Sequence, residues 1–281
     1  MAEWQRDTTW RQGRLLTPEA VQALGLLHPT HPAETLVIVA SHDCDIAQSI
    51  ASEPRVELLV GRRLNTLDLD GNFTHAKAAR TLHIGFAGDA PVLAEFVATA
   101  KYSIGKELLG DFQPAEFSRL SPAGQATFQR WLAARYHRSA FPDEFERRLV
   151  RETKLAERIA KAVKPHGELI TAVLFDVDEG VDLVRNGPHD VYLLDITLLH
   201  ATEPDFAQAE AAANTAKRVI QSDFERKLFD AQTGQWQSIE LRYLDVMSEE
   251  ALTYRQFTLL KRWRLDHLSL GAEPQQPLLA E

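Results

Sequence analysis

The sequence predicts an α+β protein with a β-rich N-terminal part and a C-terminal part in which helices cover a mainly antiparallel sheet. Short apolar runs bounded by turn residues dominate the first part of the chain. Apolar residues then recur at helical spacing, and the last third alternates strand-like runs with one long helical pattern. We therefore divide the chain into a β-rich domain at 1–112, a helical connector at 113–165 and an α+β domain at 166–281. The first of these could close into a small barrel.

The N-terminal elements follow from local signals. Thr17 and Pro18 are typical of a helix start and Gly25 of its end, so a short helix is expected between them. Two prolines make the next few residues a loop, because proline cannot donate a backbone hydrogen bond. Strands are then expected at 36–40, 55–61 and 81–85.

Helical and strand patterns share the rest of the chain. Helices are expected at 121–136 and 143–164, where Pro165 ends the second. The C-terminal domain is expected to contain a hairpin of strands, a long helix, a further strand and a last helix, at 169–175, 191–199, 205–230, 239–244 and 248–263. Trp131 and Trp263 stand at helical spacing, which favours core positions over exposed base-stacking platforms.

Composition limits the class of protein. Hydrophobic residues make up 44% and charged residues 25%, as in soluble globular proteins, and no apolar run approaches the roughly 20 residues that cross a bilayer. The N-terminus lacks the pattern of a signal peptide, so we expect a cytoplasmic protein with no membrane partner. A net charge of −9 disfavours general nucleic-acid binding. A local basic patch around Arg130, Arg135 and Arg138 keeps that partner open, although charged helix faces are more often simply solvated.

The candidate site follows the first buried strand. Four polar residues, His42, Asp43, Cys44 and Asp45, come directly after Ser41, and Cys44 is the single cysteine. In an extended segment His42 and Cys44 share one face while Asp43 and Asp45 share the other. Cys44 is then a candidate nucleophile, His42 a candidate base, and the two aspartates candidate orienting or metal-binding carboxylates. In the structural alternative, Cys44 packs as a small apolar residue and the aspartates cap a turn or helix.

Other chemistries have weaker support. His42, Asp43 and Asp45 could bind a metal with more distant partners, for which the candidates are His75, His83, Asp176, Asp178 and Glu179. No spacing matches a known metal motif, so the cofactor is unknown. A restriction-type nuclease would need a lysine two residues after a strand carboxylate, and neither Asp195-Ile-Thr nor Glu240-Leu-Arg provides one. Gly105-Lys106 lacks the upstream glycine of a phosphate-binding loop.

Three segments carry a resemblance to known proteins. Trp10–Arg14, Val39–Ile46 and Leu260–Leu268 together resemble a bacterial protein family with a strand followed by Ser-His-Asp-Cys-Asp. That resemblance implies a soluble bacterial protein and no particular activity. Arg11-Gln-Gly13 with the following strand is also similar to the small β-barrel of bacterial toxin ribonucleases of the MazF and PemK type, which implies a barrel. Those toxins usually carry Arg-Gly-Asp where this chain has Gln12-Gly13-Arg14.

Whether the chain is an enzyme stays open at this point. The first hypothesis is a hydrolase-like or ligand-binding site centred on residues 41–45. The second is a non-enzymatic interaction or accessory protein in which this segment is structural, and the third is a protein that acts on RNA or DNA.

Overall fold

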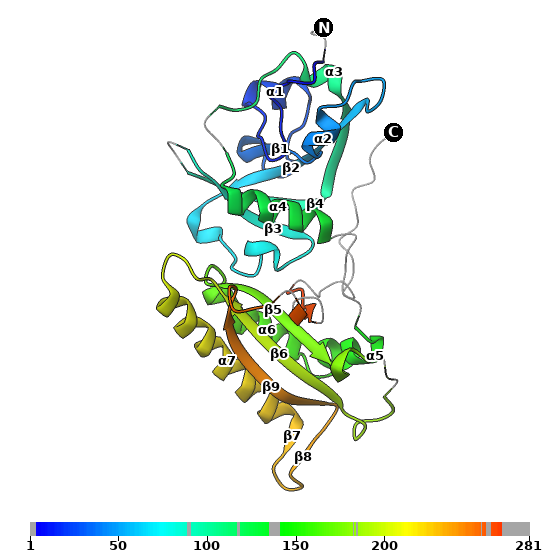
Figure 1. Ribbon diagram of the computed structural model, residues 1–281, viewed down its shortest axis with the longest axis vertical. Coiled ribbons are helices and arrows are strands. Elements are labelled where there is room, and N and C mark those ends of the chain that lie inside the picture. The colour runs from blue at the N-terminus through cyan, green and yellow to red at the C-terminus, as the bar shows by residue number, and fades with distance from the viewer. Residues whose placement is uncertain are drawn as a thin grey trace. The chain divides into compact units, whose positions relative to one another are not determined.

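The computed structural model describes residues 4–88, 91–116, 119–134, 141–181, 183, 185–253, 255–256 and 260–265. Arg135, Arg138 and the end of the Leu260–Leu268 segment lie outside these ranges. The described chain forms two compact units, which are considered separately (Figure 1). The N-terminal unit comprises 4–69 and 79–134, and the C-terminal unit comprises 70–78 and 141–265. The stretch predicted as a helical connector is thus divided between the two units.

The N-terminal unit is an antiparallel sheet with short helices around it. Its strands run in the order β1-β2-β4-β3. Its elements are α1 (Pro18–Ala23), η1 (Pro32–Glu34), β1 (Thr35–Val39), α2 (Asp43–Ile46), β2 (Arg55–Leu64), η2 (Thr66–Asp68), β3 (Thr81–Phe86), β4 (Val92–Gly105), α3 (Lys106–Leu109) and α4 (Pro122–Ala134). The cap predicted for the first helix is confirmed, because the Thr17 side chain accepts the Ala20 N–H.

The sheet of the N-terminal unit stays open, so the predicted barrel is wrong. Within the described residues, no strand pairing joins the two edge strands, β1 and β3. Each edge is instead covered by a short extended segment of its own unit. The Leu16 N–H donates to the Val37 carbonyl of β1, and the Ala87 N–H just beyond β3 donates to the Arg119 carbonyl. These hydrogen bonds occupy backbone groups at the sheet edges that a closed barrel would pair with another strand.

One glycine allows β2 and β4 to approach closely. A Cβ atom on Gly61 would lie 2.3 Å from the Glu95 carbonyl oxygen and 2.5 Å from the Phe96 ring. The pairing of β2 with β4 shifts register at this point. A side chain there would push the strands apart, so Gly61 is required for the bend in the sheet.

The C-terminal unit is a four-stranded sheet in the order β10-β5-β6-β9. Its elements are η3 (Thr74–Ala76), α5 (Asp143–Glu146), the π-helical turn η4 (Arg147–Glu152), α6 (Leu155–Val163), η5 (Lys164–His166), β5 (Ile170–Val177), η6 (Asp178–Gly180), β6 (Tyr192–His200), α7 (Phe206–Leu228), β7 (Phe229–Asp230), β8 (Gln235–Trp236), β9 (Ile239–Ser248) and β10 (Lys261–Arg262). The predicted hairpin is confirmed, because β5 and β6 pair antiparallel. Since α7 connects β6 to β9, that pair is parallel.

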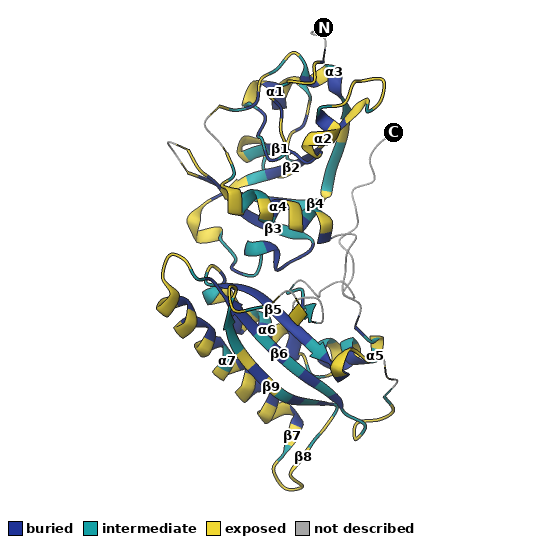
Figure 2. Cartoon of the chain, viewed as in Figure 1, coloured by how far each residue is buried: buried dark blue, intermediate teal, exposed yellow. Residues whose placement is uncertain are grey.

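One face of this sheet carries the core. The side chains of Val173 and Phe175 pack with the apolar faces of α6 and α7, whose outer faces are exposed (Figure 2). Trp263 is 1% exposed and stacks on Phe175 with ring centroids 4.6 Å apart. The predicted core position of Trp263 is therefore confirmed. Of the helix predicted at 248–263, residues 255–256 are helical, whereas residues 261–262 pair with β5 as a strand, which brings the indole to the core. Residues 254 and 257–259 of this prediction lie outside the described part of the chain.

The fold class predicted for the chain agrees with this fold in outline. Strands and helices mix with antiparallel sheets, so the α+β class is confirmed. Among the described residues, no helix combines the length and the apolar character that a bilayer crossing requires.

Candidate functional site

Residues 41–46, here called the α2 corner, turn from β1 into a single helical turn. The segment predicted as extended is helical from Asp43 onward, so the alternation that paired His42 with Cys44 does not occur. His42 is instead the N-cap residue of α2, and its Nδ1 accepts the Cys44 backbone N–H at 3.3 Å. The capping nitrogen cannot at the same time accept a proton from a thiol. Because Nδ1 accepts this hydrogen bond, the neutral ring carries its proton on Nε2, so neither ring nitrogen can act as a base while the cap is intact.

Hydrogen bonds fix the N-terminal side of the α2 corner. Ser41 is buried, and its hydroxyl accepts the Glu57 N–H of β2 at 2.8 Å. Asp43 Oδ1 accepts the Gln12 N–H at 2.7 Å, while the Gln12 side-chain amide donates to the Ala40 carbonyl at 2.8 Å. Ser41 and Asp43 therefore hold backbone segments together. The structural alternative differs in detail, because His42 and not an aspartate caps α2, and Cys44 is exposed rather than packed.

The C-terminal side of the corner is fixed by a buried lysine. Lys106 Nζ donates to the carbonyl oxygens of Asp45, Ile46 and Gln48 at 2.6, 3.3 and 2.9 Å. Burial lowers the pKa of Lys106, although the nearby carboxylates of Glu53 and Asp45 oppose that effect. The ammonium also lies 5.7 Å from the centre of the Trp4 ring. Because it collects the free carbonyl groups at the end of α2, Lys106 acts as the C-terminal cap of this short helix.

The remaining side chains of the corner face solvent. His42, Asp43, Cys44 and Asp45 are all exposed, and Cys44 is a free thiol. The four predicted catalytic residues therefore lie together on one surface turn. The hydrogen bonds of its polar groups within the described residues go to backbone atoms.

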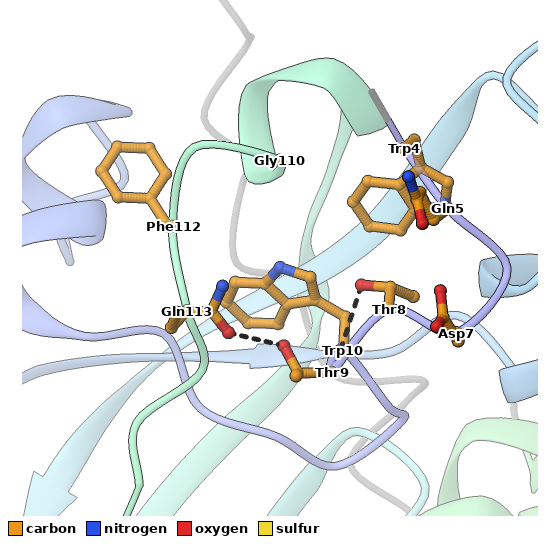
Figure 3. A pocket seen from close by; sticks show the side chains of 9 residues that line it. All are labelled: Trp4, Gln5, Asp7, Thr8, Thr9, Trp10, Gly110, Phe112 and Gln113. Atoms are coloured by element: carbon orange, nitrogen blue, oxygen red, sulfur yellow. Dashed lines mark hydrogen bonds between the residues drawn. The ribbon is translucent and has the colours of Figure 1, made fainter. Parts of the chain in front are cut away.

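A pocket lies beside the α2 corner in the same unit (Figure 3). It has a volume of about 200 Å³. We call it the N-terminal pocket, and its lining residues come from the chain start and from the segment after α3: Trp4, Gln5, Asp7, Thr8, Thr9, Trp10, Gly110, Phe112 and Gln113. In Figure 3 Trp4 and Phe112 lie on either side of the Trp10 ring.

Hydrogen bonds connect the pocket to the corner and hold its walls. The Trp4 indole N–H donates to the Ile46 carbonyl at 2.9 Å, so this wall of the pocket rests on the end of α2. The Trp10 indole N–H donates to the Leu109 carbonyl at 3.2 Å. Thr9 Oγ1 donates to Gln113 Oε1 at 2.7 Å, the contact drawn between opposite walls in Figure 3. The aromatic rings are therefore fixed in place before any ligand arrives.

A second group of polar side chains lies on the sheet of the C-terminal unit. Asp176 of β5 faces Asp195 of β6 in the antiparallel register. Arg242 of β9 binds both carboxylate oxygens of Asp195, at 3.0 and 2.7 Å, and reaches Glu179 at 2.9 Å. Burial, and then the neighbouring Asp195, raises the pKa of Asp176. Arg242 neutralises Asp195 and Glu179 beside Asp176, so this group is arranged as a charge network.

The residues suggested as metal ligands are not brought together. In the N-terminal unit, His83 is buried and binds Glu95 Oε2 at 3.0 Å. In the C-terminal unit, His75 binds the Glu168 carbonyl. Asp178 is also buried rather than solvated, and accepts from Arg185 and from the Leu193 N–H. Within the part of the chain that the structure describes, no three His, Cys, Asp or Glu side chains gather as a metal site would require.

The residues that sequence reasoning missed are those whose role depends on tertiary contacts. The sequence presents Lys106 only as a candidate phosphate-loop lysine and Gln12 only within the resemblance to toxin ribonucleases, and its local patterns assign no role to Trp4 or Asp7. The available signal for Lys106 is its place directly after a long β-rich run, next to the apolar Leu108-Leu109 pair.

No known protein family matches the sequence, and no curated protein is significantly similar to it. The site must therefore be interpreted from its own geometry.

Proposed function

We propose that the N-terminal unit is a small-molecule binding module and that the N-terminal pocket is its binding site. The observation that carries the proposal is the lining of this pocket. Three aromatic rings and several uncharged amide and hydroxyl groups line it together with one carboxylate, Asp7, and no lysine, arginine or histidine. Aromatic side chains beside hydrogen-bonding groups are common in ligand sites, and here the polar groups form slightly more of the exposed lining because Trp4 and Trp10 are largely buried.

The lining also indicates which ligand fits. A volume of about 200 Å³ is smaller than the roughly 300–1,000 Å³ typical of pockets for drug-sized ligands, so one ring with short substituents is the expected size. Asp7 is the charged group of the lining, which favours a neutral or positively charged ligand over an anion. The aromatic rings in the lining suit a flat ligand, and a cationic ligand can also make a cation–π contact with them.

The α2 corner supports this site. It positions the Trp4 indole through Ile46, while Lys106 holds the carbonyl end of α2. In this proposal residues 41–46 have the structural role of the second hypothesis, and the binding site lies next to them. Catalysis by Cys44 with His42 and the two aspartates remains a separate prediction, which requires Cys44 as nucleophile. The resemblance to a bacterial family supports the proposal that this is a bacterial cytoplasmic protein.

The experiment uses three probes of equal size and different charge, namely benzamidine, benzamide and benzoate. The chain has five tryptophans, whose indole N–H signals can be followed separately by NMR and assigned with Trp4→Phe and Trp10→Phe variants. We expect benzamidine and benzamide to shift the Trp4 and Trp10 signals. A fragment of this size should bind with a dissociation constant on the order of 1 mM.

The other tryptophans are the internal control. Trp131 and Trp263 are 1% exposed and are not pocket residues, so their signals should stay in place. The proposal is wrong if none of the probes shifts Trp4 or Trp10, or if all indole signals move together. Benzoate binding as tightly as benzamidine would overturn the charge preference.

A further inference from the structure

The arginines and lysines between residues 147 and 164 have different roles in the structure. Arg147 is paired with Glu144 and Glu152. Arg148 is 2% exposed and donates to Glu144 and to carbonyl groups. Lys164 binds Asp70 at 2.6 Å. These three cations already hold the C-terminal unit together and are not available to a ligand.

Two cations of α6 have no such partner among the described residues. Arg158 and Lys161 are exposed and stand one helical turn apart, so their side chains lie on the same side of the helix. Both line a groove between α6 and α7 whose volume is about 240 Å³. The groove therefore presents two cations that no described residue neutralises.

The other lining residues of the groove define its chemistry. Ala162 and Ala216 are buried and form apolar parts of the lining. His166 adds a hydrogen-bonding ring at the side, whereas the Thr215 hydroxyl already donates to the Ala211 carbonyl and accepts from Arg218. Asp223 is 6% exposed, and one of its oxygens accepts from Arg226, which balances its charge. The second carboxylate oxygen has no donor among the described residues.

We propose that this groove binds a small phosphorylated polyol. Arg158 and Lys161 provide charge-assisted donors for the phosphate group. The free oxygen of Asp223 accepts a hydrogen bond from a hydroxyl group of the polyol, whereas the same carboxylate repels an inorganic phosphate anion placed beside it. The groove has no Phe, Tyr or Trp among its lining residues, so it lacks the large aromatic rings on which nucleobases usually stack. Its volume is sufficient for a short carbon chain with one phosphate. The site lies in the C-terminal unit, so the proposal is independent of the N-terminal pocket.

The test is a calorimetric titration of the full chain with glycerol 3-phosphate, inorganic phosphate and glycerol at low salt. The Arg158→Gln/Lys161→Gln double variant removes the two groove cations. The matched control is Arg151→Gln/Lys154→Gln, which removes two exposed charges of the same unit that do not line the groove. Circular dichroism confirms that each variant is folded.

We expect glycerol 3-phosphate to bind at concentrations up to about 10 mM, with at least tenfold weaker binding in the groove variant and less than a twofold change in the control. Inorganic phosphate should bind at least threefold more weakly than glycerol 3-phosphate. The proposal is overturned if glycerol 3-phosphate does not bind or if both double variants weaken it equally. Equal affinities for the two phosphates would refute the polyol part. A single-stranded oligonucleotide that binds through these cations when glycerol 3-phosphate does not would assign the groove to nucleic acid instead.

Discussion

Replacing Lys77 by methionine should abolish a rise of stability with pH in the C-terminal unit. Lys77 is fully buried, and its Nζ donates to Thr74 Oγ1, the Gly167 carbonyl and the Ile170 carbonyl at 2.9, 2.6 and 2.8 Å. Burial lowers its pKa from 10.5 to about 7, and the carboxylate of Glu168 opposes this only in part. Three donated hydrogen bonds are those of an ammonium group, but burial makes this charged form less favourable in the folded unit than in the unfolded chain.

The sign and size of the effect follow from linkage. Between pH 7 and 10.5 the unfolded chain binds the Lys77 proton while the folded unit has released it. Unfolding then takes up a proton, so stability rises with pH by up to about 1.4 kcal/mol per pH unit. This gain is complete above pH 10.5 and is lost as the pH falls to about 7, below which both states are protonated.

Hydrogen exchange of the β5 and β6 amides measures this directly, because it reports the opening free energy of the C-terminal unit alone. We expect a positive slope between pH 7 and 9 in the wild type, the same slope in Lys217→Met on α7, and a flat profile in Lys77→Met. A Lys77→Met profile as steep as that of the wild type would refute the assignment of the slope to this buried amine.

Three further predictions concern the N-terminal unit. The hydrogen bond with His83, together with that from Arg62, lowers the pKa of Glu95 to about 2. The stability that this provides is present above pH 4.5 and is lost as the pH falls toward 2, so Glu95→Gln should reduce the acid-dependent loss of stability by up to about 3 kcal/mol in urea unfolding. Asp43→Ala removes the acceptor for the Gln12 N–H and should lower the free energy of unfolding by about 1 kcal/mol. Asp43→Asn keeps an acceptor oxygen and should retain most of this stability. Equal losses in the two variants would show that the carboxylate charge, and not the hydrogen bond, is what matters. Cys44 is exposed and should react with a thiol reagent without denaturant, and Cys44→Ser should change stability by less than about 0.5 kcal/mol; loss of a hydrolytic activity in Cys44→Ser would instead support the nucleophile prediction.

The sequence predicts well those parts of the fold that depend on local pattern. Apolar runs correctly located β1, β5 and β6, and the cap at Thr17 correctly started α1. Local patterns could not reveal that residues 70–78, which lie between two strands of the first unit in sequence, belong to the second. That placement depends on tertiary contacts such as the bonds of Lys77 and the close approach of Gly167, where a Cβ would lie 2.1 Å from the Gly71 Cα.

The candidate site shows the same division. The sequence identified residues 41–45 as a polar segment after a buried strand, which is what the structure contains. Whether such residues are extended or helical is decided by caps from elsewhere, here Lys106 at one end of α2 and Gln12 at Asp43. The N-terminal pocket combines segments about a hundred residues apart, so no local pattern could define it.

The most direct test of the central claim, that the N-terminal pocket binds a small neutral or cationic ring, compares the affinity of benzamidine and benzamide for the wild type and for Asp7→Asn. The account predicts that Asp7→Asn weakens benzamidine at least fivefold and leaves benzamide within twofold, because Asp7 is the charged residue that lines the pocket. It also predicts that the Trp4 and Trp10 indole signals report both titrations. Unchanged benzamidine affinity in Asp7→Asn, or binding that leaves both indole signals in place, would contradict it.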